Sequence, residues 1–248
     1  GEGGFINKGT CWVSKSFLMK KIAIIPARGG SKRIPRKNIK DFFGKPVIAY
    51  AIELAISSNF FEKIIVSTDD NEIKDIAQSY GAKVPFLRSK ETSTDKSTTF
   101  DVLKEVLDWY NLKGEFFEIG CCIYPVTPLL TFPILEKGLK ELIKKRCDSV
   151  VPLTTFSHPI QRALSINKKG FIEKKNENLF NKNTQGLPLF YHDTGQFYWF
   201  LTDKCLDFGE LITNNSSSFF LNFEEHQDVD NLYDWRLLEL KYKLKKEK

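Results

Sequence analysis

Short, uninterrupted apolar runs alternate with amphipathic segments along the first half of this chain. The run at 21–26 (KIAIIP) has the composition of a strand buried on both faces of a sheet, and 63–70 (KIIVSTDD) repeats it with a polar end. A shorter run at 82–87 predicts a third strand. Between them, 44–58 and 71–81 place apolar residues at helical spacing, and the second segment ends on a glycine suited to a helix C-terminus.

The same alternation continues to about residue 154. An amphipathic helix is predicted over 100–110, a strand running into a loop over 117–129, a helix over 132–145 capped by Thr131, and a strand over 148–154. This order predicts an α/β fold of three layers: a mostly parallel, Rossmann-like sheet with helices on both faces. Ligands of such sheets bind beyond the carboxyl ends of the strands.

The alternation stops between residues 155 and 190, where the chain is polar, rich in Asn and Lys, and interrupted by glycines. We expect a small protruding hairpin or arm there, because so long a loop in a compact domain normally has a role of its own. A strand is predicted at 195–202 and a final amphipathic helix at 228–244, whose start carries several acids.

Length and composition fit one large domain, which we place at 19–248 of the 248 residues. The glycine-rich segment 1–18 precedes Met19, the only methionine, and we expect it to be an added, disordered leader. No apolar run approaches the roughly 18 residues that a membrane helix needs. The five cysteines lack metal-ligand spacing, and their odd number favours a reducing cytoplasm.

Positive charge is concentrated just after the first predicted strand. The net charge is +6, and the loop "ARGGSKRIPRKN" (27–38) holds a dense group of cations. Gly29 and Gly30 allow unusual backbone conformations, and successive N–H groups after a strand can bind an anion. The spacing is neither GxxxxGK[ST] nor GxGxxG. The pattern favours a local polyphosphate ligand over a broad nucleic-acid surface, although a basic nucleic-acid-binding protein and a nicotinamide-dependent oxidoreductase remain alternatives.

Longer motifs connect this loop to a known family. The stretch 22–52 (IAIIPARGGSKRIPRKNIKDFFGKPVIAYAI) resembles the nucleotide-binding signature of the sialic-acid-type cytidylyltransferases. The resemblance extends through IIVSTDD, YPVTPL, SHPI, YHDTGQFYWF and DVD, and so covers nearly the whole chain from Met19. Within the family, RGGSKRIPRKNIK, YPVTPL and YHDTGQFYWF look most like the pseudaminic acid branch. The resemblance implies transfer of CMP from CTP to a nine-carbon keto acid sugar, with release of pyrophosphate.

The resemblance also implies roles for individual residues. Catalysis would depend on Arg28, Lys37 and Asp230. The positions implied for CTP binding are Ala27, Arg28, Gly29, Gly30, Ser31, Lys37, Asn38, Arg88 and Thr99, the last of which could instead be a plain helix cap. The positions implied for sugar binding are Tyr124, His158, Gln161, Arg162, Tyr191, Asp193 and Gln196. The arm over 155–190 would form a homodimer and reach toward the partner's site, and no nucleic acid or membrane partner is expected.

Asp228 and Asp230 are the implied ligands of Mg²⁺, with Mn²⁺ as an alternative. Mg²⁺ usually takes one or two carboxylates together with substrate phosphates and water. Acids at a helix start also favour the helix dipole, so the pair has a structural reading as well.

Two departures bear on the sugar. N-acetylneuraminate enzymes typically show QPTSPLR where this chain has YPVTPLL, so Tyr124 replaces the sugar-facing glutamine and Leu130 the arginine. The basic residue after the family's His-Pro pair falls here at Gln161, with Arg162 next to it. The changes at Tyr124 and Leu130 indicate a pocket for a less polar, deoxygenated sugar, because hydrogen-bonding groups must match the substrate. The change at Gln161 leaves open which residue would bind the sugar carboxylate. Pseudaminic acid is therefore favoured, and N-acetylneuraminate and legionaminate remain alternatives.

Overall fold

The computed structural model of this protein describes residues 18–94 and 96–247. The expectation of a disordered leader over 1–18 falls, except for Leu18, outside these residues. Within the described ranges, no helix is long and apolar enough to cross a membrane.

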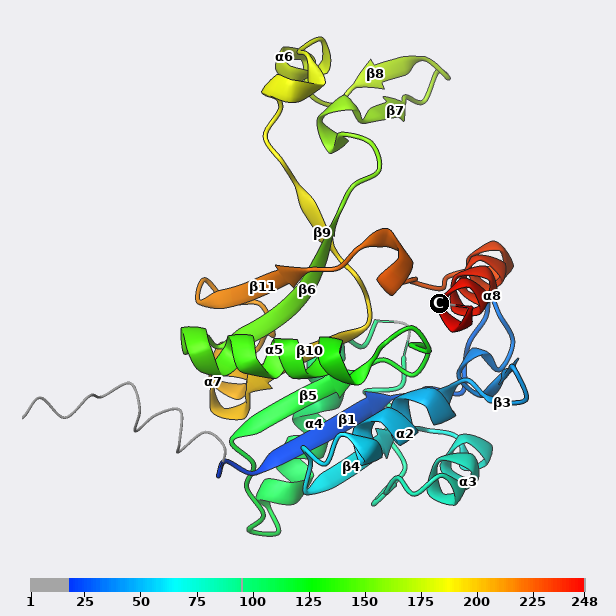
Figure 1. Ribbon diagram of the computed structural model, residues 1–248, viewed down its shortest axis with the longest axis vertical. Helices are drawn as coiled ribbons and strands as arrows, with labels where there is room; N and C mark the ends of the chain where they lie inside the picture. The colour runs from blue at the N-terminus through cyan, green and yellow to red at the C-terminus, as the bar shows by residue number, and fades with distance from the viewer. Residues whose placement is uncertain (1–17, 95, 248) are drawn as a thin grey trace, which may run out of the picture.

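A seven-stranded sheet runs through the centre of the part of the chain that the structure describes, in the order β11-β6-β10-β5-β1-β4, with β9 paired to β6 (Figure 1). Its strands are β1 (Lys21–Pro26), β4 (Lys63–Ser67), β5 (Ile119–Ile123), β6 (Ser149–Thr155), β9 (Tyr191–Asp193), β10 (Phe197–Leu201) and β11 (Ser216–Phe220). β1 runs parallel to β4 and β5, and β6 runs parallel to β11. β10 lies between β5 and β6 and is antiparallel to both. The sheet is therefore mixed and mostly parallel, as the sequence predicts.

Helices cover both faces of the sheet. They are α2 (Ile48–Ser57), α3 (Asn71–Ser79), α4 (Thr99–Asn111), α5 (Phe132–Lys145) and α7 (Thr202–Phe208), while α8 (Leu232–Lys246) lies beside the sheet. α2, α3 and α5 share one apolar cluster with alternate strand residues such as Ala23 and Ile25. α4 and α7 share a second cluster with the intervening residues, including Ile22 and Ile24. Successive side chains of β1 therefore point to opposite faces of the sheet and enter two different apolar cores. The sheet and the helices on its two faces form the expected three layers.

A third apolar cluster fixes the loop that follows β1. Ile34 and Phe42 of this region pack with Val229 and with Trp235 and Leu238 of α8. Short elements here are the single turn η1 (Lys37–Ile39) and the hairpin β2 (Asp41–Phe42) and β3 (Lys45–Pro46). The C-terminal helix therefore lies against the loop beyond β1, about 190 residues away in sequence.

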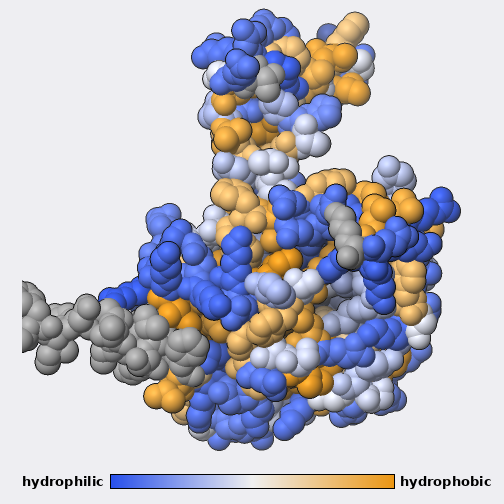
Figure 2. Space-filling model, viewed as in Figure 1, coloured by the Kyte–Doolittle hydropathy of each residue, from blue (hydrophilic) through white to orange (hydrophobic). Residues whose placement is uncertain are grey.

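An arm extends from the body of the protein between β6 and β9 (Figure 1). Its elements are η2 (Ile160–Arg162), the hairpin β7 (Leu164–Ile166) and β8 (Ile172–Lys174), α6 (Glu177–Phe180) and η3 (Thr184–Gly186). Large apolar side chains are exposed along it: Ile160, Leu164, Ile166, Phe171, Ile172, Leu189 and Phe190. Figure 2 shows apolar surface on this projection. The segment predicted to be an arm is one, and its role in dimerisation stays a prediction.

Several boundaries differ from the sequence-based expectations. The strand predicted at 82–87 is reduced to an isolated bridge between Ile65 and Lys83, because Pro85 cannot donate to a ladder. The last helix begins at Leu232 and not at 228, because Asn231 caps it by accepting the N–H groups of Tyr233 and Asp234.

The hydrophobic and polar pattern also failed to predict several elements and one helix cap. Thr131 precedes α5 but makes no capping bond with its side chain. β9, α7 and the serine-rich β11 had no recognised signal, and η4 (Phe223–Glu225) follows β11 as a further short turn. Gly81, with φ of +95°, ends α3 as predicted.

Candidate active site

The cationic loop after β1 is anchored to β4 at its start and closed by a hydrogen bond between its two ends. At its start, the Ala27 amide donates to the Ser67 carbonyl at 2.9 Å. At its end, the Asn38 side-chain amide donates to the Arg28 carbonyl at 2.9 Å, and Asn38 is buried. The loop therefore has a fixed path between β1 and η1 before any ligand binds.

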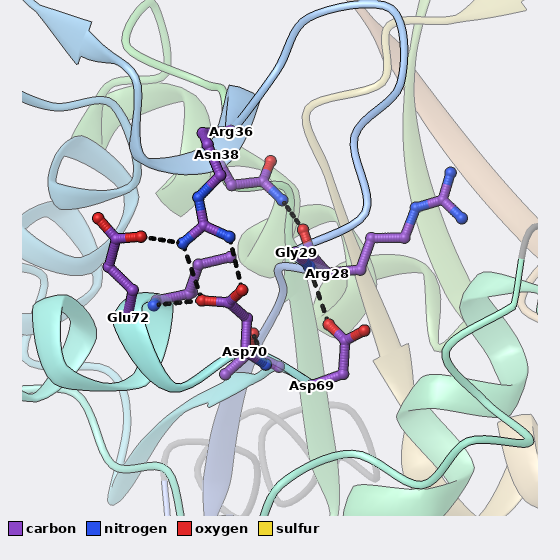
Figure 3. A network of polar contacts seen from close by, with 9 residues as sticks. Arg28, Gly29, Arg36, Asn38, Asp69, Asp70 and Glu72 are labelled. Atoms are coloured by element: carbon purple, nitrogen blue, oxygen red, sulfur yellow. Dashed lines mark hydrogen bonds and ion pairs between the residues drawn. The ribbon is translucent and has the colours of Figure 1, made fainter.

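Two adjacent acids beyond β4 hold this loop from below (Figure 3). The Gly29 amide donates to Asp69 Oδ1 at 2.8 Å. A Cβ at Gly29 would lie 2.6 Å from Asp70 Oδ2, so only glycine allows so close an approach. From the sequence, we expected Gly29 to allow the close approach of a ligand. In the structure, the group that leaves no room for a side chain at Gly29 is Asp70. Nothing lies within 4 Å of a Cβ built at Gly30.

Arg36 joins the far end of the loop to the same acids (Figure 3). Its guanidinium donates to Asp70 Oδ2 at 2.5 Å and to Asp70 Oδ1 at 2.9 Å, and it also pairs with Glu72. Asp70 in turn caps α3 by accepting the Ile73 amide at 3.0 Å. The Arg36 guanidinium is the main reason that the pKa of Asp70 falls to about 2. We call Arg36, Asp70 and Glu72 the loop clamp; its arginine is turned toward α3, away from the cleft described next.

The first cleft opens beside this loop and has a volume of about 420 Å³. It is bordered by the cationic loop, the start of α4, the segment after β5, the turn before β10 and the residues before α8. The sequence-predicted residues that line it are Arg28, Ser31, Lys37, Asn38, Arg88, Thr99, Tyr124, Asp193, Asp228 and Asp230. The cationic loop and the Asp-x-Asp pair, far apart in sequence, therefore share one cleft.

Lys37 lies between the loop and the acidic pair. Its Nζ donates to the carbonyl of Val229, the residue between Asp228 and Asp230 in the chain, at 2.7 Å. Burial lowers the pKa of Lys37, and the two carboxylates oppose that shift. Burial and the neighbouring Asp230 raise the pKa of Asp228. Asp230 also pairs with Arg33 at 2.8 Å in a largely exposed contact.

The two carboxylates fit a magnesium ion in number and kind. Mg²⁺ commonly takes one or two carboxylates and completes its shell with phosphate oxygens and water. Among the described residues no cluster of three or more metal-ligating side chains occurs, so a protein-only cage is absent there. The unfavourable pairing of Asp228 with Asp230 is the kind of repulsion that a bound cation relieves.

Arg88 lies on the wall of the first cleft formed by the end of β4. It is buried, and its Nε donates to Ser67 Oγ at 3.1 Å while a terminal nitrogen donates to the Ser67 carbonyl. Burial lowers the pKa of Arg88, and the charges of Asp69 and Glu105 oppose the shift. These contacts fix the guanidinium plane at the cleft edge.

A row of hydroxyls forms another wall. The hydroxyls of Thr99 and Tyr124 are 2.7 Å apart, and the ring of Tyr124 meets Tyr198 edge to face. The Tyr198 hydroxyl donates to Asp193. Burial raises the pKa of both tyrosines, so both remain protonated donors. Thr98, not Thr99, caps α4, together with Asp101, so the plain-cap alternative for Thr99 is wrong.

A second cleft, of about 790 Å³, adjoins the first. Asp193 and Asp228 line both clefts, so the two spaces meet at these carboxylates. Tyr191 lies in the second cleft, as do apolar residues of β11 and its following turn. The first cleft is basic and the second is less polar, and Asp228 lies where they meet.

Several predicted residues lie outside both clefts. Gln161 and Arg162 belong to η2, which packs against α6 within the arm, and His158 lies just before it. Gln161 donates to the Pro188 carbonyl, and Arg162 donates to the Lys182 carbonyl at 3.0 Å. These bonds fold the arm and do not bring the three residues to the clefts of their own chain. Gln196 is buried, and its amide donates to the Glu225 carbonyl at 2.7 Å. Ala27, Gly29 and Gly30 shape the loop without lining either cleft.

The structure also adds residues that the sequence did not single out. Arg33, Ser97 and Thr98 line the first cleft, as does Tyr198. The alternation of side chains along β10 could have indicated Tyr198. It places Tyr198 and Phe200 on the sheet face that α4 covers, and Phe197 on the opposite face. Nothing in the pattern distinguished the role of Arg36 from that of its cationic neighbours.

Comparison with known proteins identifies the family. The sequence profile described as Cytidylyltransferase matches residues 22–202. The chain belongs to the cytidylyltransferase family. This cytidylyltransferase is 37% identical over 229 residues to the pseudaminic acid cytidylyltransferase of Campylobacter jejuni, covering 92% of this chain and 99% of that protein. It is 32% identical over 235 residues to the CMP-N,N'-diacetyllegionaminic acid synthase of Legionella pneumophila, with the same coverage of each chain.

A solved structure shows the same fold. The CMP:2-keto-3-deoxy-manno-octonic acid synthetase complexed with CTP superposes with a TM-score of 0.67 at 18% identity, covering 92% of this cytidylyltransferase and 100% of that chain. The fold class predicted from the sequence is confirmed. Family membership also favours nucleotidyl transfer over the nucleic-acid-binding and oxidoreductase alternatives.

Proposed function

We propose that this protein transfers CMP from CTP to the anomeric hydroxyl of a nine-carbon keto acid sugar and releases pyrophosphate, and that pseudaminic acid is its acceptor. One observation carries the proposal: the cationic loop and the Asp228–Asp230 pair line a single cleft in a chain of this family. The names of the relatives in Campylobacter jejuni and Legionella pneumophila support an acceptor of the nonulosonic acid class.

The triphosphate would lie along the cationic loop. In the reaction the anomeric oxygen bonds to the α-phosphorus as the bond to pyrophosphate breaks, and negative charge grows on the leaving group. Such transfers depend chiefly on positioning and on neutralising this charge. Arg28 and Lys37 line the cleft where they can do so, and Ser31 adds a hydroxyl donor. Because Lys37 is already bonded to the Val229 carbonyl, its ammonium is fixed before the substrate arrives.

Nucleotide recognition would fall to the opposite wall. Arg88 presents a guanidinium held by Ser67, and Thr99 presents a hydroxyl bonded to Tyr124. Asn38 uses its amide nitrogen within the loop, which leaves its carbonyl oxygen as an acceptor. These groups fit the ribose and the cytosine edge, which offer hydroxyl and amino donors and carbonyl acceptors.

Mg²⁺, or Mn²⁺ in its place, would be held by Asp228 and Asp230. When bound, the ion supplies charge neutralisation on the phosphates and lowers the pKa of a coordinated hydroxyl. The raised pKa of Asp228 and the exposure of both carboxylates to the cleft support this assignment. Both carboxylates precede the N-cap Asn231 and lie outside the first turn of α8, which favours the metal role over a role limited to the helix dipole.

The sugar would occupy the second cleft, next to Asp193 and Tyr191. Gln161 and Arg162 lie within the arm and outside both clefts of their own chain, so they would meet a sugar bound to another copy of the chain. His158 follows Ser157, which lines the second cleft of its own chain. We therefore propose a homodimer in which the exposed apolar side chains of the arm become buried. An unpaired apolar surface of this kind commonly marks an association site.

The reaction would take place in the cytoplasm, which the four buried, unpaired cysteines among the described residues support.

The deciding experiment is a panel of purified acceptor sugars with CTP, followed by pyrophosphate release with and without Mg²⁺. We expect release with pseudaminic acid and none after chelation of the metal. Release with N-acetylneuraminate or legionaminate alone would contradict the proposed acceptor. Absence of release with every keto acid sugar would contradict the proposed reaction.

A further inference from the structure

Arg33 contacts one of the two carboxylates that we assign to the metal. Its Nη2 lies 2.8 Å from Asp230 Oδ1, and the two side chains are 69% and 52% exposed. Asp230 Oδ1 is an oxygen that a coordinated cation would use, so the guanidinium and the cation compete for it. An exposed ion pair contributes little stability, and a divalent ion can therefore displace the arginine.

The backbone on both sides of this contact is fixed by other interactions. Ile34, next to Arg33 in the chain, is buried in the third apolar cluster together with Val229. The amide of Asp230 donates to Asp234 Oδ2 at 2.9 Å, which holds the acidic segment at the start of α8. The loop and the acids therefore stay together when the contact between Arg33 and Asp230 opens, and only side chains need to move.

Lys37 and Arg33 meet the acidic segment in different ways. The Lys37 ammonium donates to the Val229 carbonyl at 2.7 Å and its side chain is half-buried, so its position is fixed. Arg33 contacts a carboxylate and has most of its side chain in solvent. The loop thus carries one fixed cation and one exchangeable cation beside the same pair of acids.

The second partner of Arg33 follows from which cleft each residue lines. Asp228 lines both clefts, whereas Asp230 and Arg33 line the first cleft and not the second. Arg33 is therefore on the side assigned to the triphosphate and away from the cleft assigned to the sugar. Arginine can bind a phosphate group through two parallel hydrogen bonds, and a triphosphate carries more negative charge than one carboxylate.

We propose that Arg33 exchanges Asp230 for the triphosphate when the divalent ion binds. The guanidinium holds Asp230 before the ion arrives, and afterwards it neutralises charge on the pyrophosphate that leaves. No covalent bond changes in this exchange, since one ion pair opens and another forms. Arg33 thus couples binding of the ion to binding of CTP. This inference rests on the proposed function, because it uses the metal and nucleotide positions assigned there.

The first measurement is Mn²⁺ binding to the full chain without nucleotide, followed by electron paramagnetic resonance of the free ion. Arg33→Ala removes the competitor for Asp230 Oδ1, so it should bind Mn²⁺ about two- to fivefold more tightly, the range of one exposed ion pair. Asp230→Asn identifies the site, because this variant should lose the binding. Arg33→Lys keeps a cation at the position and should stay near the wild-type affinity.

The second measurement is CTP binding by calorimetry, with Mg²⁺ and with a chelator. Arg33→Ala should weaken CTP binding about tenfold with Mg²⁺, the effect of one lost charge-assisted hydrogen bond. With the chelator the loss should be clearly smaller, because Asp230 then still holds the guanidinium in the wild type. The same substitution should therefore change the affinities for the ion and for the nucleotide in opposite directions.

Lys32→Ala is the matched control, since it removes one positive charge from the same loop and Lys32 also lines the first cleft. A general effect of charge would give this variant the same pattern, whereas the exchange is specific to Arg33. The melting temperature of Arg33→Ala should equal that of the wild type, because the contact that it removes is exposed. A markedly lower melting temperature would show that the contact supports the fold instead.

The outcomes separate this inference from the function on which it rests. Weaker or unchanged Mn²⁺ binding in Arg33→Ala would overturn the exchange. An unchanged CTP affinity, or an equal loss with Mg²⁺ and with the chelator, would do the same. Identical changes in Lys32→Ala would also overturn it, because they would reflect total charge. A wild-type chain that neither binds CTP nor releases pyrophosphate would instead overturn the proposed function.

Discussion

Breaking the loop clamp is the perturbation whose size follows most directly from the structure. Arg36→Ala removes the guanidinium that contacts both Asp70 and Glu72, and Asp70→Asn removes the charge while keeping a side chain that can cap α3. With the double variant, these changes form a cycle that isolates the Arg36–Asp70 interaction from the cap.

The pKa of Asp70 sets the magnitude. It falls from 3.8 to about 2, and each unit corresponds to about 1.4 kcal/mol, so the upper bound is roughly 2.5 kcal/mol. Part of the shift belongs to the backbone amides of Ile73 and Glu72. The Arg36 side chain is 38% exposed, which allows water to screen the pair. We therefore expect a coupling free energy of about 1 kcal/mol, and a melting temperature about 2–4 °C lower in Arg36→Ala.

The assay is urea unfolding of the four proteins at several pH values. Because the folded pKa of Asp70 is lowered, the unfolded state binds more protons, and stability from the pair is complete above pH of about 4. It should be lost as the pH falls toward 2, so the difference between wild type and Asp70→Asn should shrink over that window. KM for CTP should also rise a few-fold in Arg36→Ala, because a released loop must be ordered upon binding.

A coupling free energy below about 0.3 kcal/mol at neutral pH would refute this reasoning, since it would match an exposed ion pair with no structural role. A difference between wild type and Asp70→Asn that persists unchanged at pH 3 would refute the assignment of the pKa shift to Arg36. Loss of stability with an unchanged KM for CTP would show that the clamp supports the fold and not the loop.

Three further predictions concern the site and the arm. Arg28→Ala should weaken CTP binding about 10- to 100-fold by calorimetry, the scale of a lost charge-assisted hydrogen bond, and unchanged affinity would place the triphosphate elsewhere. Asp230→Asn should retain the wild-type melting temperature, because its contact with Arg33 is exposed, yet lose about 100-fold or more in turnover; an active variant would remove it from the metal site. Ile166→Lys combined with Phe171→Lys should convert a dimer to a monomer in light scattering, because both side chains are largely exposed in the single chain, and a dimer that persists would exclude the arm as the interface.

The sequence was most informative where a residue's role depends on its immediate neighbours. The apolar run at 21–26 predicted β1, because a strand buried on both faces needs consecutive apolar residues, and these are visible in the sequence. Gly81 predicted the end of α3 because the left-handed conformation is a local requirement. Prediction failed at 82–87, where composition favours a strand but Pro85 leaves only one bridge. It failed again at β11, whose serines pair with β6 for reasons of position and not of propensity.

The candidate site shows the same division. Motifs identified Arg28, Lys37, Asp228 and Asp230, and the tertiary structure brought them to one cleft. Motifs could not distinguish Arg36, whose charge looks equivalent to that of its neighbours until Asp70 and Glu72 are placed opposite it. The contact between Arg33 and Asp230 carried no sequence signal either, because it depends on the fold that brings the acids to the loop.

The sequence by itself determined the alternation of buried strands and amphipathic helices, the cationic loop after the first strand and the family. Those properties follow from side-chain chemistry read along the chain. Only the tertiary structure decided that Gly29 makes room for Asp70, that Arg36 faces α3, and that α8 brings the acids to the loop. Contacts between segments some 190 residues apart depend on how the sheet and helices pack. Close packing involves side chains from every element together, so it cannot be read from any one segment.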